Sequence, residues 1–124
     1  MGSSIKKGKH GELIAAEFLQ AKGFKLHFTN YRLGRFEVDL VCEIENMIVV
    51  VEVKALSSLY FKQPFESVCI DKQRKIIQVA DHLLKTRFMN RDCRFDVVSI
   101  YLSNNGPQIE HIEDAFIPEI GAGY

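Results

Sequence analysis

Apolar residues recur at helical spacing in two stretches of the chain. Between Gly8 and Lys22 they fall three or four positions apart, and Gly23 follows where a helix C-terminus commonly takes a left-handed residue. A second amphipathic pattern runs from about Glu66 to Phe88. Since each pattern gathers its apolar residues on one side of a helix, we expect two helices that each bury a single face.

Runs of alternating or continuous apolar residues predict strands in the other segments. The predicted strands are residues 24–30, 37–44, 47–56 and 93–102, with a short extended segment at 109–112. Glu45 and Asn46 suit a two-residue turn between the second and third strands, and a long loop containing Pro64 follows the third. The resulting order, α-β-β-β-α-β, predicts an α/β domain with one mixed sheet.

The two-residue turn determines which residues of its two strands face each other. Counting outward from the turn, Asp39 is expected opposite Glu52, and Glu37 opposite Lys54. Because side chains alternate across a strand, these four polar residues share one face, while valines and leucines share the other. We therefore expect one face of this hairpin to be core and the other to be acidic.

Two carboxylates held opposite each other repel unless a cation lies between them. Directly opposed Cβ atoms in a sheet are about 4.5–5.5 Å apart. Mg²⁺ prefers hard oxygen ligands and keeps several waters, which suits Asp39, Glu52 and a strand carbonyl. Lys54 on the same face can orient an attacking water or stabilise negative charge on a phosphate. The hairpin thus predicts a site for Mg²⁺, or Mn²⁺, beside a lysine.

Composition limits the class of protein. The 124 residues are 47% hydrophobic and 26% charged, which is typical of one soluble domain, here expected over residues 1–124 with a core of about 8–116. No apolar run approaches the roughly 20 residues that span a bilayer, and the N-terminus does not read as a signal peptide, so we expect a cytoplasmic protein. The three widely spaced cysteines favour buried, reduced thiols over disulfides or a zinc site.

Charge is distributed unevenly although the net charge is zero. Residues 1–35 and 71–94 carry seven Lys or Arg each, against two and three acidic residues, whereas 36–70 and 95–124 are acidic. Two basic segments around an acidic one suit a surface that binds a polyanion around an acidic centre holding a cation. Alternatively, both basic segments are helices with solvated faces.

Several of these residues also stand in the order of a known family. Asp39, followed after twelve residues by Glu52-Val53-Lys54, matches the D-(x)n-(D/E)-x-K signature of the PD-(D/E)XK nuclease superfamily. The longer ordered series is Gly11-Glu12, Ala16, Gly23-Phe24, Asn30-Tyr31-Arg32, Glu37-Val38-Asp39-Leu40, Val51-Glu52-Val53-Lys54, Lys72, Ala80 and Arg94-Phe95-Asp96-Val97-Val98. Over about residues 8–102 it resembles the YraN family of uncharacterised, endonuclease-like bacterial proteins. The glutamate of the first helix resembles that of archaeal Holliday-junction resolvases.

The resemblance implies a restriction-endonuclease-like fold and a role with nucleic acid. It implies Asp39 and Glu52 as metal ligands and Lys54 as the catalytic lysine, with Glu12 completing the catalytic set and Glu37 as an accessory residue. The candidate nucleic-acid contacts are Lys9, Arg32, Lys72 and Lys75. Asp96 is expected to be structural, paired with Arg94 or a neighbouring strand, and the four histidines receive no role.

Three functions remain open at this point. The leading hypothesis is a Mg²⁺-dependent nuclease that hydrolyses phosphodiesters in DNA, including branched or structured DNA. The second is a nucleic-acid-binding module that keeps the fold without cutting; it rests on Phe36, where the family pattern usually has glycine, and on Ala55-Leu56, where a small polar residue and an arginine often follow. The third is a protein-interaction subunit whose acidic face docks a basic partner without a metal. A homodimer is compatible with each.

Overall fold

The helices and strands follow the predicted order. The computed structural model describes residues 2–57 and 68–117, with side chains from residue 9 onward. The elements are α1 (Gly2–Ala21), β1 (Lys25–Leu33), β2 (Phe36–Ile44), β3 (Met47–Ser57), α2 (Ile70–Thr86), β4 (Asp92–Leu102) and β5 (Gln108–Ile112). The predicted loop around Pro64 lies outside the described residues.

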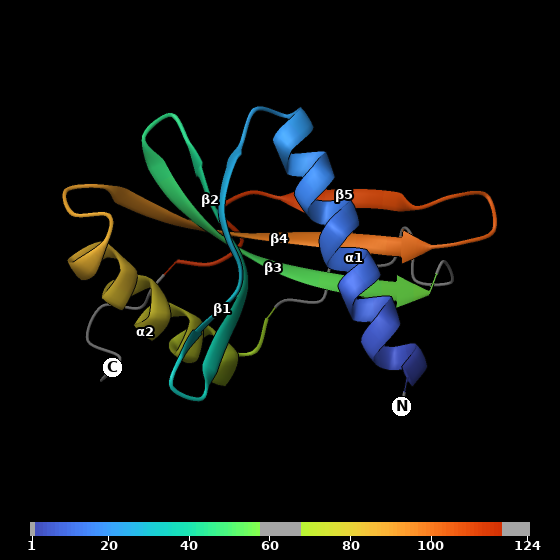
Figure 1. The fold of residues 1–124 in the computed structure, drawn as a ribbon, viewed down its shortest axis with the longest axis horizontal. Helices are drawn as coiled ribbons and strands as arrows, with labels where there is room; N and C mark the ends of the chain where they lie inside the picture. Colours follow the sequence, from blue (N-terminus) through green and yellow to red (C-terminus); the bar gives the residue numbers. More distant parts are fainter. Residues whose placement is uncertain (1, 58–67, 118–124) are drawn as a thin grey trace.

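The strands form one mixed sheet between the two helices. Their spatial order is β1-β2-β3-β4-β5, in which β3 and β4 are parallel and the other neighbours antiparallel. A parallel pair needs a crossover connection, and α2 lies within it. Helix α1 crosses one face of the sheet and α2 packs on the other (Figure 1). The predicted α/β class, with a restriction-endonuclease-like core and a mixed sheet flanked by helices, is confirmed.

The hairpin between β2 and β3 has the predicted turn and register. Glu45 and Asn46 both have positive φ, 49° and 66°, as the two central residues of a type I′ turn require. The ladder runs from the residues flanking the turn to the pair Leu40 and Val51, in the register counted from the sequence. Beyond that pair the N–H of Val53 donates to a carboxylate oxygen of Asp39 at 2.7 Å. A side chain thus takes the place of the next backbone partner.

The expectation that one face of this hairpin is acidic was wrong. Both faces are core: one buried cluster packs on α1 and includes Leu40, Val49 and Val51, and another packs on α2 and includes Val41 and Val50. The reason is the continuous apolar run at the start of β3, which is typical of a strand covered on both sides. Asp39 and Glu52 lie beyond the paired segment, which ends at Leu40 and Val51.

Side-chain alternation is interrupted where the ladder between β2 and β3 ends. Val38 packs in the α2 cluster, although Leu40, two residues away, packs in the α1 cluster. Strict alternation would place both on one face, so the strand must turn at Asp39. On the neighbouring strand Asn30 has φ 50° and lies between the residues that pair with Val38 and Leu40. This irregularity lies opposite Asp39, next to the end of the ladder between β2 and β3.

Some boundaries and one thiol differ from the prediction. Strand β1 continues to Leu33 instead of ending near residue 30, because the twist at Asn30 does not break its pairing with β2. Helix α2 begins at Ile70, and the segment at 109–112 becomes an edge strand. All three cysteines are free, but Cys69 is exposed because it precedes the first turn of α2. In the described parts of the chain, no helix is long and apolar enough to cross a membrane.

Candidate functional site

The structure brings the carboxylates of Asp39 and Glu52 together where β2 and β3 separate. The side chain of Glu52 is 4% exposed and Asp39 is half-buried. Burial, followed by the charge of Glu52, raises the pKa of Asp39 to about 7. Burial also raises the pKa of Glu52, although a neighbouring ammonium opposes this shift. Both groups therefore resist carrying a full negative charge in the protein as it stands.

Hydrogen bonds and ion pairs satisfy only some of the oxygen atoms of this carboxylate pair. Asp39 Oδ2 accepts the Val53 N–H, and Glu52 Oε2 lies 3.0 Å from the Nζ of Lys72. The other oxygen of Glu52, Oε1, is buried and has no hydrogen-bond partner among the described residues. A buried charged oxygen without a partner is costly, because the water it has lost is not replaced. A bound proton or cation would therefore stabilise this site.

Lys72 supplies the cation that the structure places at this pair. It stands in the first turn of α2, and its side chain is 56% exposed even though its ammonium contacts the buried Glu52. Burial lowers the pKa of Lys72, but attraction to Glu52 and Asp39 outweighs this effect, so its pKa is raised. The Lys72 ammonium thus contacts Glu52 directly and acts on Asp39 through its charge.

Glu12 approaches the pair from α1. The side-chain amide of Asn30 donates to Glu12 Oε2 at 2.9 Å, and the charge of Glu12 adds to the upward shift of the Asp39 pKa. Helix α1 comes this close to β3 because Gly11 has no side chain: a Cβ there would lie 3.2 Å from the Cβ of Ala55. The small residue at position 55 is therefore needed for the packing of α1.

The expected pairing of Glu37 with Lys54 was wrong. Glu37 is opposite Arg32 on β1, and the guanidinium Nε donates to its carboxylate at 2.8 Å. The physical reason is that the ladder between β2 and β3 ends at Leu40, before it reaches Glu37. Lys54 is half-buried on β3, two residues beyond Glu52. Lys54 and Glu52 are thus near each other along β3, whereas Glu37 belongs to the β1–β2 hairpin.

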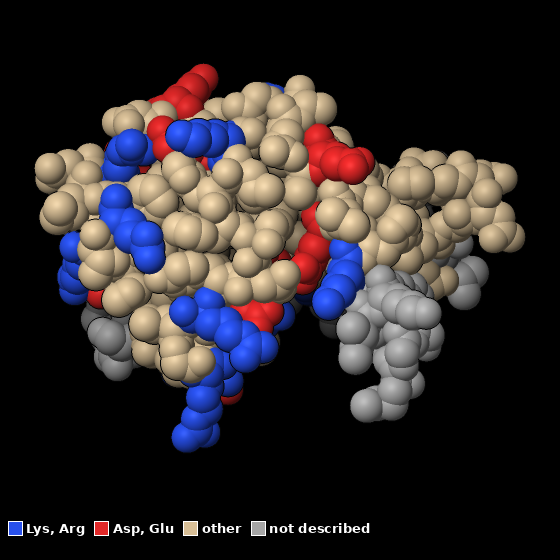
Figure 2. Space-filling model, in the orientation of Figure 1, with Lys and Arg blue, Asp and Glu red and all other residues tan. Residues whose placement is uncertain are grey.

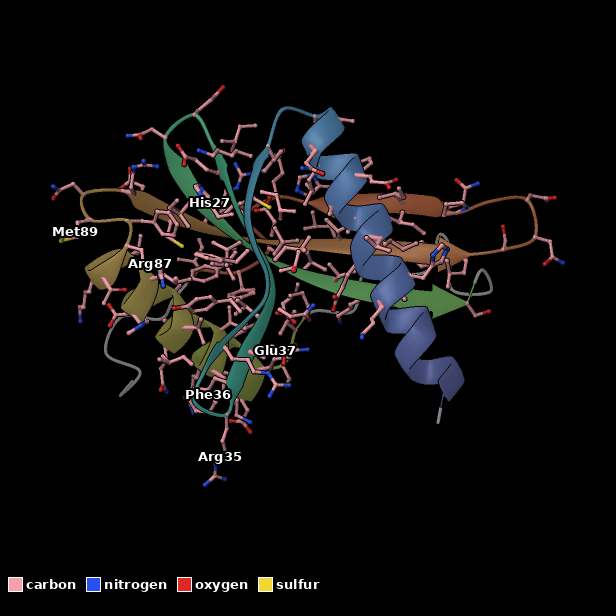
Figure 3. All side chains as sticks on the ribbon, viewed as in Figure 1. His27, Arg35, Phe36, Glu37, Arg87 and Met89 are labelled. Carbon is pink, nitrogen blue, oxygen red and sulfur yellow. The ribbon has the colours of Figure 1, made fainter. Side chains whose placement is uncertain are left out.

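A groove of about 550 Å³ runs between the tip of that hairpin and the start of α2. Its walls include the basic side chains of Arg35, Lys72 and Lys75 and the ring of Phe36. Figure 3 shows Arg35 extending from the hairpin tip, with Phe36 close by. In Figure 2, lysine and arginine side chains gather over the region where Figure 1 places α2 and this hairpin. The groove thus carries three basic residues together with the acidic Glu37 and Asp71, and it adjoins the carboxylate pair through Lys72.

The basic residues predicted to contact nucleic acid are distributed over different parts of the surface. Lys72 and Lys75 line the groove described above, whereas Lys9 lines a second groove of about 480 Å³ between α1 and β1, with Glu12 and Asn30. Arg32 is 73% exposed and bonded to its strand partner. Of these four residues, Lys72 is the one whose contact with the carboxylate pair the structure describes.

The donor set at the pair suits a hard divalent cation. Within residues 2–57 and 68–117, no group of three or more His, Cys, Asp or Glu side chains is arranged to hold a metal ion. Asp39 and Glu52 offer carboxylate oxygens. One of these, Oε1 of Glu52, is buried and has no partner among the described residues. Mg²⁺ is commonly bound by one or two carboxylates and keeps the rest of its shell as water or substrate oxygens. The residues present therefore fit such an ion.

A second buried carboxylate, Asp96 on β4, is fully paired. Arg94 donates to its two oxygens at 2.8 and 2.9 Å, and the N–H of Asp114 donates at 3.0 Å. His111 Nε2 lies 2.8 Å from Oδ2. The predicted pairing of Asp96 with Arg94 is confirmed. The role of His111 was missed, since it depends on the pairing of β4 with β5 and no spacing in the sequence marks it.

Comparisons with known proteins give one family. Residues 11–100 match the model described as uncharacterised protein family UPF0102. A UPF0102 protein of Bacteroides thetaiotaomicron is 36% identical over 120 residues, covering 97% of this chain and 99% of its own length. UPF0102 proteins of Clostridioides difficile and Natranaerobius thermophilus are 41% and 42% identical, covering 90% and 89% of this chain and 96% of each relative.

A solved structure is similar at a much greater distance. Pyrococcus furiosus SfsA in complex with Ca²⁺ matches 89% of this chain and 63% of its own, with 12% identity and a TM-score of 0.41. A likeness this weak indicates nothing about ligands or activity.

Proposed function

The chain belongs to the uncharacterised protein family UPF0102, the YraN family, and from this premise we propose that it is a nuclease-like protein that hydrolyses phosphodiesters in DNA with a divalent cation. The observation that carries the proposal is the pair formed by the buried Glu52 and the half-buried Asp39, which has one oxygen without a partner among the described residues and adjoins a groove with three basic side chains. Strongly perturbed carboxylates beside a groove are typical of functional sites.

In this proposal Asp39 and Glu52 hold Mg²⁺ or Mn²⁺. When bound, such an ion neutralises phosphate charge and makes water more acidic. The carboxylates contribute hard oxygen ligands and, because they are largely removed from bulk water, a strong local negative potential. Glu12 strengthens that potential from α1, as its effect on the pKa of Asp39 indicates. The arrangement favours cation binding over simple ion pairing with a lysine.

Lys54 is assigned to the chemical step. Its half-buried position on β3, two residues from Glu52, allows its ammonium to orient an attacking water or to stabilise charge that develops on the phosphate. The groove side chains Arg35, Lys72 and Lys75 are assigned to the nucleic-acid backbone, which they contact as charges without reading sequence. We place the protein in the cytoplasm, because its three cysteines are free.

A cleavage assay tests this function. Branched, flapped, single-stranded and duplex DNA, and the matching RNA forms, are incubated with the protein and Mg²⁺ or Mn²⁺. Wild type is expected to cut at least one DNA form. Lys54→Ala is expected to bind that DNA equally well but to cut it about 10²–10³-fold more slowly. Glu17→Gln, an exposed change on α1, serves as the control and should cut at the wild-type rate.

Two outcomes would contradict the proposal in different ways. If wild type leaves every nucleic acid intact but binds it, the non-cutting module replaces the nuclease. If Lys54→Ala cuts as fast as wild type, the assignment of Lys54 is wrong even though the protein is a nuclease. The interaction-subunit alternative requires an exposed acidic face, and Glu52 is buried.

A further inference from the structure

Lys72 is placed where it can serve two partners in turn. Its ammonium lies 3.0 Å from the carboxylate of Glu52, whose side chain is 4% exposed. The Lys72 side chain itself is 56% exposed and lines the groove that Arg35 and Lys75 also line. The same four-carbon stem therefore borders both a buried anion and a surface that suits phosphates. A lysine in this position can exchange one for the other by rotation about its side-chain bonds.

The backbone that carries Lys72 is anchored. The next residue, Gln73, donates its main-chain N–H to the carbonyl of Cys69 at 3.0 Å, and its side-chain amide donates to the carbonyl of Val68 at 2.7 Å. These bonds hold the first turn of α2 against the segment that precedes it. An exchange of partners by Lys72 therefore needs movement of its side chain alone.

Charge balance gives a reason for the exchange. Lys72 contributes one positive charge beside two carboxylates, and Glu52 Oε1 has no partner in the described part of the chain. A divalent ion bound by Asp39 and Glu52 supplies more positive charge and takes over the neutralisation. It also repels an ammonium held at the same carboxylate, because like charges at contact distance in a partly buried site are unfavourable. Lys72 is then better placed on a phosphate in the groove.

We propose that Lys72 is an exchangeable counter-ion, which neutralises Glu52 while no divalent ion is bound and moves to a backbone phosphate of the nucleic acid when one is. This rests on the proposed function and adds its regulation. The exchange makes ion binding and nucleic-acid binding assist each other, since the ion releases a lysine for the phosphate. By linkage, the phosphate must strengthen ion binding by the same factor.

Ion affinity without nucleic acid gives the first test. Mn²⁺ binding is measured by calorimetry at pH 8.5, above the pKa of about 7 of Asp39, for wild type, Lys72→Met and Lys75→Met. Lys75 lies one turn along α2, is exposed, and lines the same groove, so it is the matched control. We expect Lys72→Met to bind Mn²⁺ roughly five-fold or more tightly than wild type, because the competing ammonium is gone, and Lys75→Met to bind as wild type.

The salt dependence of DNA binding gives the second test. Affinities are measured over a range of NaCl concentrations, with Ca²⁺ or with EDTA, on the DNA form that wild type binds best. Each additional phosphate contact steepens the slope of log affinity against log salt by about 0.9. With Ca²⁺, wild type and Lys75→Met should each gain about one such contact, whereas Lys72→Met should gain none.

Failure of this inference can be told apart from failure of the proposed function. If wild type binds Mn²⁺ but Lys72→Met binds it equally or more weakly, or if the wild-type slope is the same with Ca²⁺ and EDTA, the exchange is wrong and the metal site stands. If wild type binds neither Mn²⁺ nor Ca²⁺, both are wrong. Should Lys72→Met not fold, Lys72→Gln, which is also uncharged but keeps a polar end, gives the same comparison.

Discussion

Two buried carboxylate clusters lie on one sheet and are neutralised to different degrees. On β4, Asp96 is 0% exposed and receives bonds from Arg94, His111 and the N–H of Asp114. Burial alone would raise its pKa, but these partners outweigh burial and lower it. At the separation of β2 and β3, Asp39 and Glu52 share one ammonium, and the pKa of Asp39 rises to about 7.

The difference separates a structural carboxylate from a candidate ligand. Asp96 already has every partner that it needs, and its bonds tie β4 to β5 and to the segment that follows β5. It has nothing left to offer a cation. The pair of Asp39 and Glu52 keeps one oxygen unsatisfied and costs stability without a further positive charge. Because a bound cation would offset this cost, the pair of Asp39 and Glu52 is the candidate metal site.

Neutralising each cluster should change stability in opposite directions, and this is the largest expected effect. Asp96→Asn removes the charge that Arg94 and His111 surround and should lower the free energy of unfolding by about 3 kcal/mol. Asp39→Asn removes repulsion with Glu52 and should leave the metal-free protein as stable as wild type or more so. Urea denaturation at pH 8 measures both. Equal losses would mean that the two clusters do not differ.

The pH dependence of stability should come from the two clusters in separate ranges. The pKa of Asp39 is raised from 3.8 to about 7, so the unfolded chain releases this proton first, and stability falls as pH rises from about 4 to 7. The pKa of Asp96 is lowered, so its contribution is present above 3.8 and is lost as pH falls further.

Denaturation at a series of pH values checks this assignment. Between pH 4 and 7 the difference between wild type and Asp39→Asn reports on Asp39 together with Glu52, whose pKa is also raised and whose charge acts on Asp39. We expect the variant to gain stability relative to wild type as pH rises through this range. A constant difference between the two proteins across that range would show that the pKa of Asp39 is not raised.

Removing a more distant charge should give the smallest effect. Glu12 contributes to the raised pKa of Asp39 from α1, after burial and Glu52. Glu12→Gln should therefore lower the pKa of Asp39 by a fraction of a unit, measured by NMR titration of its carboxyl carbon. Glu17→Gln, on the exposed side of the same helix, should leave it unchanged. An identical shift in the two variants would indicate a general change in net charge.

The fold was largely predictable because its signals are local. The turn at Glu45 and Asn46 gave the register of β2 and β3 directly, and the apolar patterns gave both helices and the strands. The end of that ladder at Leu40 was not predictable, because nothing in the sequence of the hairpin marks it; it coincides with the left-handed Asn30 in the neighbouring strand. For the same reason, the partner of Glu37 was predicted on the wrong strand.

The candidate site was predictable in its carboxylates but not in its cations. Asp39 and Glu52 belong to one hairpin, so counting residues brings them together. The contact of Lys72 with Glu52 crosses from a helix to a strand, and the contact of His111 with Asp96 depends on an edge strand. No spacing along the chain encodes such contacts, because they follow from how helix and sheet pack. Which carboxylates have their full set of hydrogen-bond and ion-pair partners can therefore be determined only from the three-dimensional structure.

Paramagnetic broadening by Mn²⁺ tests the central claim most directly. The amides of Val53 and Asp114 each donate to one of the compared carboxylates, Asp39 and Asp96, so each reports on its own cluster. In a titration of ¹⁵N-labelled protein at pH 8, the Val53 signal should broaden more strongly than the Asp114 signal at each Mn²⁺ concentration. If the Asp114 signal broadens first, or the Val53 signal stays sharp at saturating Mn²⁺, then Asp39 and Glu52 are not the metal site.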